Sequence, residues 1–306
     1  MPFFLVFAFY ILKFDKMNDF LFDNACFQTY NLSMGKMLVD RVAFTLFGVD
    51  IYWYGVIITS AILLSFALMF VVLKRRGRRT DELFDLAICV LPLAILSARL
   101  FSVLFDAGLD LSDYFSFRTG GMSIIGAIIG GVLGILLFCA IKKKNFFDMA
   151  DFVAPFLLMS QAIGRWGNYF NQEIYGGIVE DVNLQWFPYA VQIGGEWFQA
   201  LFFYEFIFNL VGAILLFTLL GTCKKRGVIT CVYMMFYGGV RFFLEDLRNV
   251  EYVLKWGNIA VSKLFSGLLF LVGFGILLFI LFNEYFKHRK LSRSVRDVVE
   301  EKKTDV

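Results

Sequence analysis

Seven apolar runs, each long enough to cross the hydrocarbon core of a bilayer, alternate with short polar segments along this chain. They extend approximately over Trp53–Leu73, Phe84–Phe105, Gly120–Ile141, Phe147–Asn168, Ala200–Leu220, Gly227–Arg248 and Ala260–Phe282. An earlier apolar stretch, Phe3–Leu12, is too short to span, because ten residues of helix rise only about 15 Å. The pattern predicts an all-α polytopic membrane protein with seven transmembrane helices and a short N-terminal interfacial helix.

Positive charge is concentrated in every second segment between these runs, at residues 74–79, 142–144 and 224–226 and from 287 onward. The alternate segments are acidic or neutral. The positive-inside rule places the basic segments in the cytoplasm, so the N-terminus is predicted outside and the C-terminus inside. The expected organisation is an N-terminal interfacial or extracytoplasmic segment (1–52), a seven-span domain (53–286) and a charged cytoplasmic tail (287–306).

Composition agrees with this membrane interpretation and excludes several other classes of protein. Apolar residues make up 59% of the 306 positions and the mean hydropathy is +0.70, which is atypical of a soluble domain. The net charge of +3 comes from short clusters and indicates no nucleic-acid partner. The five cysteines have no metal-ligand spacing, and the one histidine, His288, lies in the basic tail, so neither a metal site nor a cofactor is expected.

Polar side chains from five of the runs fall at one depth when each helix is followed at about 1.5 Å per residue. Tyr237, Arg241 and Glu245 share one face of the sixth run, because they are spaced four residues apart. Asp151, at the cytoplasmic end of the fourth run, is the main exception. The residues expected to meet in the outer leaflet are Tyr54, Arg99, Arg165, Glu205 and Arg241.

Several arginines at the depth of the lipid headgroups suit a bound phosphate, which a guanidinium group grips with paired donors. The alternative is structural: the arginines pair with Glu205, Glu245 or Glu173 and only hold the bundle together. In the third run, Gly126, Gly130 and Gly134 recur every four residues, a pattern that favours close helix packing over a phosphate cradle.

The densest polar motif, IGRWGNYFNQEIYGG at residues 163–177, interrupts the apolar pattern. It resembles the signature of the phosphatidylglycerol–prolipoprotein diacylglyceryl transferases, G-R-x-G-N-F-x-N-x-E with a glycine three residues on. Tyr169 takes the place of the aromatic residue. The other matching positions are Gly164, Arg165, Gly167, Asn168, Asn171, Glu173 and Gly176.

The resemblance extends along most of the chain. Trp53-Tyr54-Gly55 is similar to an N-terminal W-Y-G, and the stretch from Tyr237 to Arg248 is similar to the closing Y-G-x-x-R-x-x-x-E-x-x-R. Further similar segments are Ser97–Leu100 (family G-A-R-L), Gly120–Ser123 (G-G-M-[SA]), Ala150–Pro155 (A-D-x-[IV]-A-P) and Tyr204-Glu205 (L-Y-E).

The resemblance implies an enzyme of the bacterial cytoplasmic membrane whose active site faces the outer leaflet. It would transfer the diacylglyceryl group of phosphatidylglycerol to the lipobox cysteine of preprolipoproteins, forming a thioether and releasing glycerol phosphate, with no cofactor. The catalytic residues implied are Arg165, Arg241, Tyr54 and Glu245. The residues implied to bind substrate are Arg165, Asn168, Asn171, Glu173, Gly176, Arg99, Tyr237, Arg248 and Glu205.

Two positions depart from the family pattern. Ile125 stands where the family has a histidine, or in some members a tyrosine, and Gln199-Ala200 replaces a histidine–proline pair. The first change leaves the base for the incoming thiol open among Tyr54, Glu245 and the headgroup phosphate. An anion or lipid transporter, or a lipid-binding protein, could use the same arginines without chemistry and is the alternative function.

Overall fold

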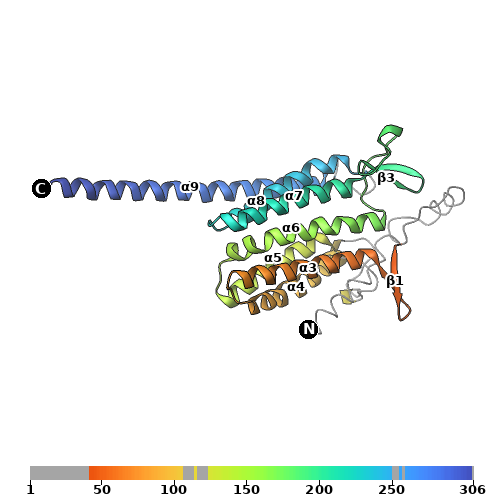
Figure 1. The fold of residues 1–306 in the computed structure, drawn as a ribbon, viewed down its shortest axis with the longest axis horizontal. Helices are drawn as coiled ribbons and strands as arrows, with labels where there is room; N and C mark the ends of the chain where they lie inside the picture. Colours follow the sequence, from red (N-terminus) through yellow and green to blue (C-terminus); the bar gives the residue numbers. More distant parts are fainter. Residues whose placement is uncertain (1–40, 106–113, 116–122, 250–254, 257–258, 305–306) are drawn as a thin grey trace.

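The structure is a computed structural model in which seven helices lie side by side and one of them continues far beyond the rest (Figure 1). The expected interfacial helix at Phe3–Leu12 falls outside the residues it describes, as does most of the segment from Gly120 to Ser123. The described residues are 41–105, 114–115, 123–249, 255–256 and 259–304.

The helices follow the predicted apolar runs closely. Six of them are long and apolar enough to cross a membrane, and a shorter apolar stretch, Gly126–Lys142, lies within α5. The prediction of a helical, polytopic membrane protein is therefore confirmed. The helices are α3 (Trp53–Arg75), α4 (Asp81–Phe105), α5 (Ile124–Lys142), α6 (Phe146–Asn171), α7 (Leu201–Thr222), α8 (Val228–Leu244) and α9 (Val261–Thr304).

Short antiparallel hairpins, which the apolar pattern did not predict, accompany the helices. The first two lie at the same end of the bundle (Figure 1), and two short 3-10 helices occur at Val182–Leu184 and Glu245–Leu247. The loops that join α3 to α4, α5 to α6 and α7 to α8 lie at the opposite end. The hairpins are β1 (Val42–Leu46) with β2 (Val49–Tyr52), β3 (Ala190–Ile193) with β4 (Glu196–Gln199), and β5 (Lys255–Trp256) with β6 (Ile259–Ala260).

Close packing between α4 and α5 depends on the glycine repeat of α5. A Cβ atom on Gly126, Gly130 or Gly134 would lie 2.4, 2.2 and 2.6 Å, respectively, from backbone atoms of α4. Only hydrogen at these positions lets the two backbones approach, as in small-residue interfaces of membrane helices. The packing interpretation of these glycines is confirmed.

Asp151 joins α6 to the start of α8. Its carboxylate accepts hydrogen bonds from the backbone N–H of Gly227 (2.6 Å) and Thr230 (2.7 Å) and from the Thr230 hydroxyl (2.6 Å). The first N–H groups of a helix have no acceptor within the helix, and here a carboxylate from a neighbouring helix accepts their hydrogen bonds. This inner polar residue therefore has a structural partner at the end of the bundle away from the first two hairpins.

Candidate functional site

A buried carboxylate, Glu205 of α7, joins two arginines from different helices. Glu205 Oε2 lies 2.6 Å from Nη1 of Arg165 on α6, and Glu205 Oε1 accepts from Nη1 of Arg241 on α8. The Glu205 side chain is 3% exposed, whereas Arg165 and Arg241 are 18% and 12% exposed. One anion thus holds two guanidinium groups close together and leaves part of each accessible.

Glu245, at the end of α8, extends this network toward α9. Its Oε2 lies 2.9 Å from Nη2 of Arg241, and its Oε1 lies 3.7 Å from Nη1 of Arg248. The Ser262 hydroxyl at the start of α9 donates a hydrogen bond to Oε1 of the same carboxylate. The network defined by Arg165, Glu205, Arg241, Glu245 and Arg248, hereafter the arginine cluster, contains three cations and two anions.

The turn after α6 positions the amides and the acid of the 163–177 motif. The N–H of Glu173 donates to the carbonyl of Asn168 (3.0 Å), and the N–H of Gln172 donates to the carbonyl of Tyr169 (3.1 Å). This pair of bonds is the Schellman ending of a helix, with Gln172 at φ 55° where glycine is usual. The turn buries Asn168 and Glu173, and the Asn171 amide donates to Glu173 Oε1 at 3.4 Å.

Gly176 connects this turn to the arginine cluster. It forms a bridge with Arg248, and its N–H donates to the carbonyl of Gln199 at 3.0 Å. A Cβ atom here would lie 2.7 Å from Gln199 Cβ and 2.9 Å from the Leu247 carbonyl oxygen. Gly176 is therefore required for close approach, which fixes Arg248 beside the chain that follows α6.

Two tyrosines flank Arg165. The Tyr54 ring on α3 occupies the space beside Gly167, where a Cβ would lie 2.6 Å from a ring carbon, and Tyr54 lies near both Arg165 and Glu173. Tyr237 on α8 lies within hydrogen-bonding reach of Arg165. Tyr237 is on the same helix as Arg241, but the hydrogen bond described for it is with Arg165.

The two titratable groups at the outer edge of the site have shifted pKa values. Burial raises the pKa of Glu173, and the Asn171 hydrogen bond and the charges of Arg41 and Arg248 oppose this rise. Burial, reinforced by the positive charge of Arg241, lowers the pKa of the Arg248 guanidinium. Both shifts reflect the cost of placing a charge away from water.

Most of the residues predicted for the site come together, from α3, α6, α7 and α8 and from the segments that follow α6 and α8. Arg165, Glu205, Arg241, Glu245 and Arg248 form one network of ion pairs, and Tyr54, Tyr237, Asn168, Asn171, Glu173 and Gly176 adjoin it. Arg99 is completely buried in α4, a helix that packs mainly against α5. The ion pairs expected in the structural alternative are present at Glu205 and Glu245, but three arginines share these two acids.

Three contributors were not predicted from the sequence: Ser262, Arg41 and Gln199. Ser262 reaches Glu245 from the start of α9, Arg41 lies near Glu173, and Gln199 abuts Gly176. Ser262 lies in an apolar run and Arg41 in a mixed segment before the first run, so neither belongs to a recognisable motif. For Gln199, the departure from the family pattern at Gln199-Ala200 was a feature of the sequence that could have indicated its role.

The fold and the cluster define a polytopic membrane protein with a buried arginine–glutamate network at the hairpin end of its bundle. A family model described as "Prolipoprotein diacylglyceryl transferase" matches residues 41–279, a range that contains every residue of the site. The chain therefore belongs to the prolipoprotein diacylglyceryl transferase family.

Curated relatives extend the similarity over nearly their whole length. The chain is 38% identical over 252 residues to the phosphatidylglycerol–prolipoprotein diacylglyceryl transferase of Clostridium novyi, covering 80% of this chain and 96% of that protein. It is 35% identical over 254 residues to the enzyme of the same name from Listeria monocytogenes, with coverages of 80% and 91%. The Clostridium botulinum enzyme is 36% identical over 259 residues, with coverages of 82% and 100%.

Proposed function

We propose that this protein transfers the diacylglyceryl group of phosphatidylglycerol to the lipobox cysteine of preprolipoproteins. The sulfur of the cysteine thiolate forms a bond to the glycerol carbon that bears the phosphate. The bond from that carbon to the phosphate oxygen breaks, and glycerol phosphate leaves with the electron pair. Family membership supports the reaction, and the observation that carries it in this chain is the pair of arginines held by Glu205.

The arginine cluster supplies what this reaction requires most, stabilisation of negative charge on the leaving phosphate. Arg165 and Arg241 bind the phosphodiester of the lipid and stabilise the additional charge that develops as the carbon–oxygen bond breaks. Glu205 fixes the distance between them, and Glu245, which also pairs with Arg248, holds Arg241 from the other side. The third arginine leaves the cluster one positive charge in excess, which suits an anionic headgroup.

The surrounding residues bind the rest of the lipid headgroup and position the arginines. Asn168, Asn171 and Glu173 offer amide and carboxyl groups to the headgroup hydroxyls, and Gly176 keeps the chain close enough to hold Arg248. Tyr237 positions Arg165. Arg99 contributes further positive charge from α4.

The proton of the incoming thiol passes to an oxygen atom of the site. Tyr54, Glu245 and the headgroup phosphate are the candidates from the sequence, and Glu173, which lies near Tyr54, joins them. Glu245 already holds two guanidinium groups and the Ser262 hydroxyl, so its protonation would remove partners from all three. Glu173 has a raised pKa, which favours proton uptake nearer neutral pH.

The protein crosses the cytoplasmic membrane seven times, α5 included, with its N-terminus outside and its C-terminus in the cytoplasm. Support comes from the loops at 74–79, 142–144 and 224–226, which carry the positive charge that marks the cytoplasmic side. The arginine cluster lies at the other end of the helices and faces the outer leaflet. Residues 1–52 form an extracytoplasmic or interfacial segment, 53–286 the catalytic domain and 287–306 a cytoplasmic extension.

The test uses purified protein in vesicles that contain phosphatidylglycerol and a synthetic lipobox peptide. Mass spectrometry should detect a diacylglyceryl adduct on the peptide cysteine. Arg165→Ala and Arg241→Ala should each lower the rate about 100-fold or more, as expected for loss of a group that stabilises developing charge. Arg226→Ala, an exposed arginine at the opposite end of the bundle, is the control and should keep the activity.

Absence of the adduct with folded wild-type protein would contradict the transfer. Phosphatidylglycerol that binds, or crosses the bilayer, without peptide modification would then favour the transporter or lipid-binding alternative.

A further inference from the structure

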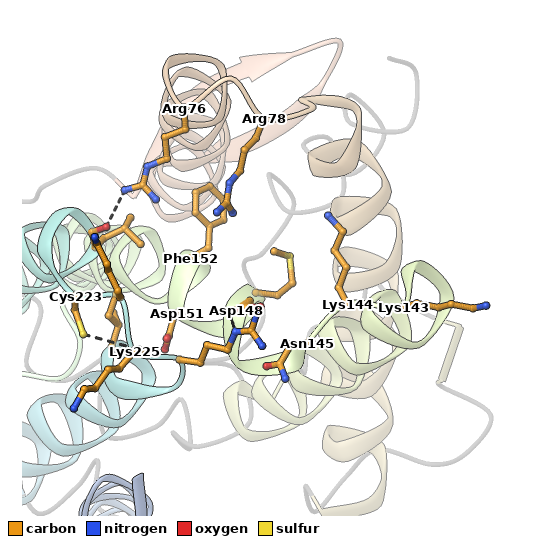
Figure 2. A pocket seen from close by; sticks show the side chains of 15 residues that line it. Arg76, Arg78, Lys143, Lys144, Asn145, Asp148, Asp151, Phe152, Cys223 and Lys225 are labelled. Atoms are coloured by element: carbon orange, nitrogen blue, oxygen red, sulfur yellow. Dashed lines mark hydrogen bonds and ion pairs between the residues drawn. The ribbon is translucent and has the colours of Figure 1, made fainter. Parts of the chain in front are cut away.

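A pocket of about 790 Å³ opens at the end of the bundle opposite the arginine cluster (Figure 2). It lies between the three loops that join α3 to α4, α5 to α6 and α7 to α8. The apolar residues of its lining include Met149, Phe152, Leu220 and Ile229. The volume is within the usual range for sites that bind small ligands.

Positive charge dominates the lining of this pocket. Seven of its fifteen lining residues are lysine or arginine, drawn from all three loops, against two aspartates. Arg78 points into the hollow toward Phe152 (Figure 2). Segments about 70 residues or more apart in the sequence thus contribute cations to one concave surface.

The acids near the pocket neutralise only part of this charge. Asp148 pairs with Arg226 at 2.9 Å, and the Asp151 carboxylate accepts three hydrogen bonds from Gly227 and Thr230 at the start of α8. Glu82 pairs with Lys144. Among the residues that the structure describes, several of the lining cations have no ion pair: Arg76, Arg78, Lys143, Lys224 and Lys225.

We propose that this pocket, hereafter the basic pocket, binds the phosphate group of a second anionic ligand. Guanidinium and ammonium groups from three loops line the pocket, and such groups bind phosphate, while the apolar lining residues accommodate carbon next to the phosphate. The phosphate belongs either to the headgroup of an anionic phospholipid in the adjacent leaflet or to a small soluble phosphate compound. Basic pockets between membrane helices are suited to lipid headgroups.

The positive-inside rule alone does not explain this arrangement. It requires basic residues on one side of the membrane but not their convergence on a hollow. Lys74 and Arg75 lie at the end of α3, beside the first of these loops, and do not line the pocket. They provide a control in which the same positive charge is removed from the same end of the bundle.

The experiment compares wild-type protein, a pocket variant (Arg78→Gln with Lys225→Gln) and a surface variant (Lys74→Gln with Arg75→Gln). Native mass spectrometry of the detergent-solubilised full chain measures retention of added phosphatidic acid, with phosphatidylcholine as the neutral lipid control. A second series adds inorganic phosphate as a competitor. Thermal melting and diacylglyceryl transfer are measured in parallel to confirm that each variant is folded.

The pocket variant is expected to bind one phosphatidic acid roughly 25-fold more weakly, since each basic residue contributes about fivefold near a lipid headgroup. The surface variant should stay within about threefold of wild type, because its two residues do not line the pocket and salt screens their charges over about 8 Å. Competition by inorganic phosphate at millimolar levels would identify a soluble phosphate compound as the ligand. Resistance to it would identify the lipid.

Equal weakening in the two variants, or no weakening in either, would overturn the proposal. This outcome is distinct from failure of the proposed transfer function, because the substituted residues lie at the far end of the bundle from the arginine cluster. Loss of transfer in wild-type protein would leave the binding comparison intact.

Discussion

Glu205→Gln is the most informative single substitution at the arginine cluster, because it removes one charge and leaves the shape of the side chain nearly unchanged. Glu205 is the only described carboxylate that pairs with both Arg165 and Arg241, which come from α6 and α8. Glutamine offers one acceptor oxygen in place of two. The two guanidinium groups would then repel each other without an anion between them.

The expected cost can be estimated from burial. The carboxylate is 3% exposed, and its Oε2 lies 2.6 Å from Arg165. Removing one partner of such a buried ion pair typically destabilises a protein by about 3–5 kcal/mol, because the remaining charge keeps its desolvation cost. For a protein of this size, that loss corresponds to a decrease in melting temperature of the order of 10 °C.

The assay combines thermal melting with the rate of peptide modification. Glu205→Gln should lower both, and Glu205→Gln combined with Arg165→Gln should recover much of the stability without activity, because the unpaired charge is gone. Glu196→Gln, an exposed acid on β4, is the control and should change neither. If the losses of stability caused by Glu205→Gln and Arg165→Gln were additive in the double variant, the idea that Glu205 holds the arginines would be refuted.

Three further predictions concern other parts of the molecule. Gly176→Ala should reduce the rate of transfer strongly, because the added Cβ would lie 2.7 Å from a neighbouring side-chain carbon. Gly177→Ala is the control and should keep the rate, because no atom lies within 4 Å of its added Cβ. Equal rates in the two variants would contradict the requirement for glycine at position 176. Asp151→Asn should destabilise the fold by about 1–3 kcal/mol, measured as a lower melting temperature, while the folded enzyme keeps its rate. The control, Asp148→Asn, should lower the free energy of unfolding by less than about 1 kcal/mol. Because the pKa of Glu173 is raised, its contribution to stability is present below the ordinary value of 4.5 and is lost as pH rises through the folded value. The melting temperature of Glu173→Gln should therefore not show this loss of stability as pH rises. Melting temperatures of wild type and Glu173→Gln that change with pH in parallel would contradict the raised pKa of Glu173.

The helices could be predicted from the sequence because a bilayer allows few alternatives. Backbone groups in hydrocarbon must bond within the segment, so a long apolar run becomes a helix, as in the prediction of Ala200–Leu220 and the observed Leu201–Thr222. The hairpins lie outside the apolar runs, so this argument does not predict them. Gly194-Gly195, between the alternating residues of β3 and β4, was a usable hairpin signal.

Convergence at the site could be predicted in part, because topology and helical rise fix the depth of each side chain. Arg165, Glu205 and Arg241 meet as their depths required. Rotation of each helix about its axis is set by packing, so depth alone does not show that Tyr237 lies beside Arg165. The role of Asp151 depends on partners 76 and 79 residues further along the chain, a pairing that no local pattern contains.

Ile125, where the family has a histidine, changes what the site must provide. The one histidine of the chain, His288, lies in the C-terminal half of α9, so the bases considered for the proposed reaction are oxygen groups. A cysteine thiol is already a few per cent thiolate at neutral pH, and a weak base is therefore sufficient. Departure of glycerol phosphate, by contrast, requires charge stabilisation that water-poor surroundings do not supply. In the proposed reaction Arg165 and Arg241, held by one buried carboxylate, would supply it, so that reaction would depend on these arginines more than on any single base.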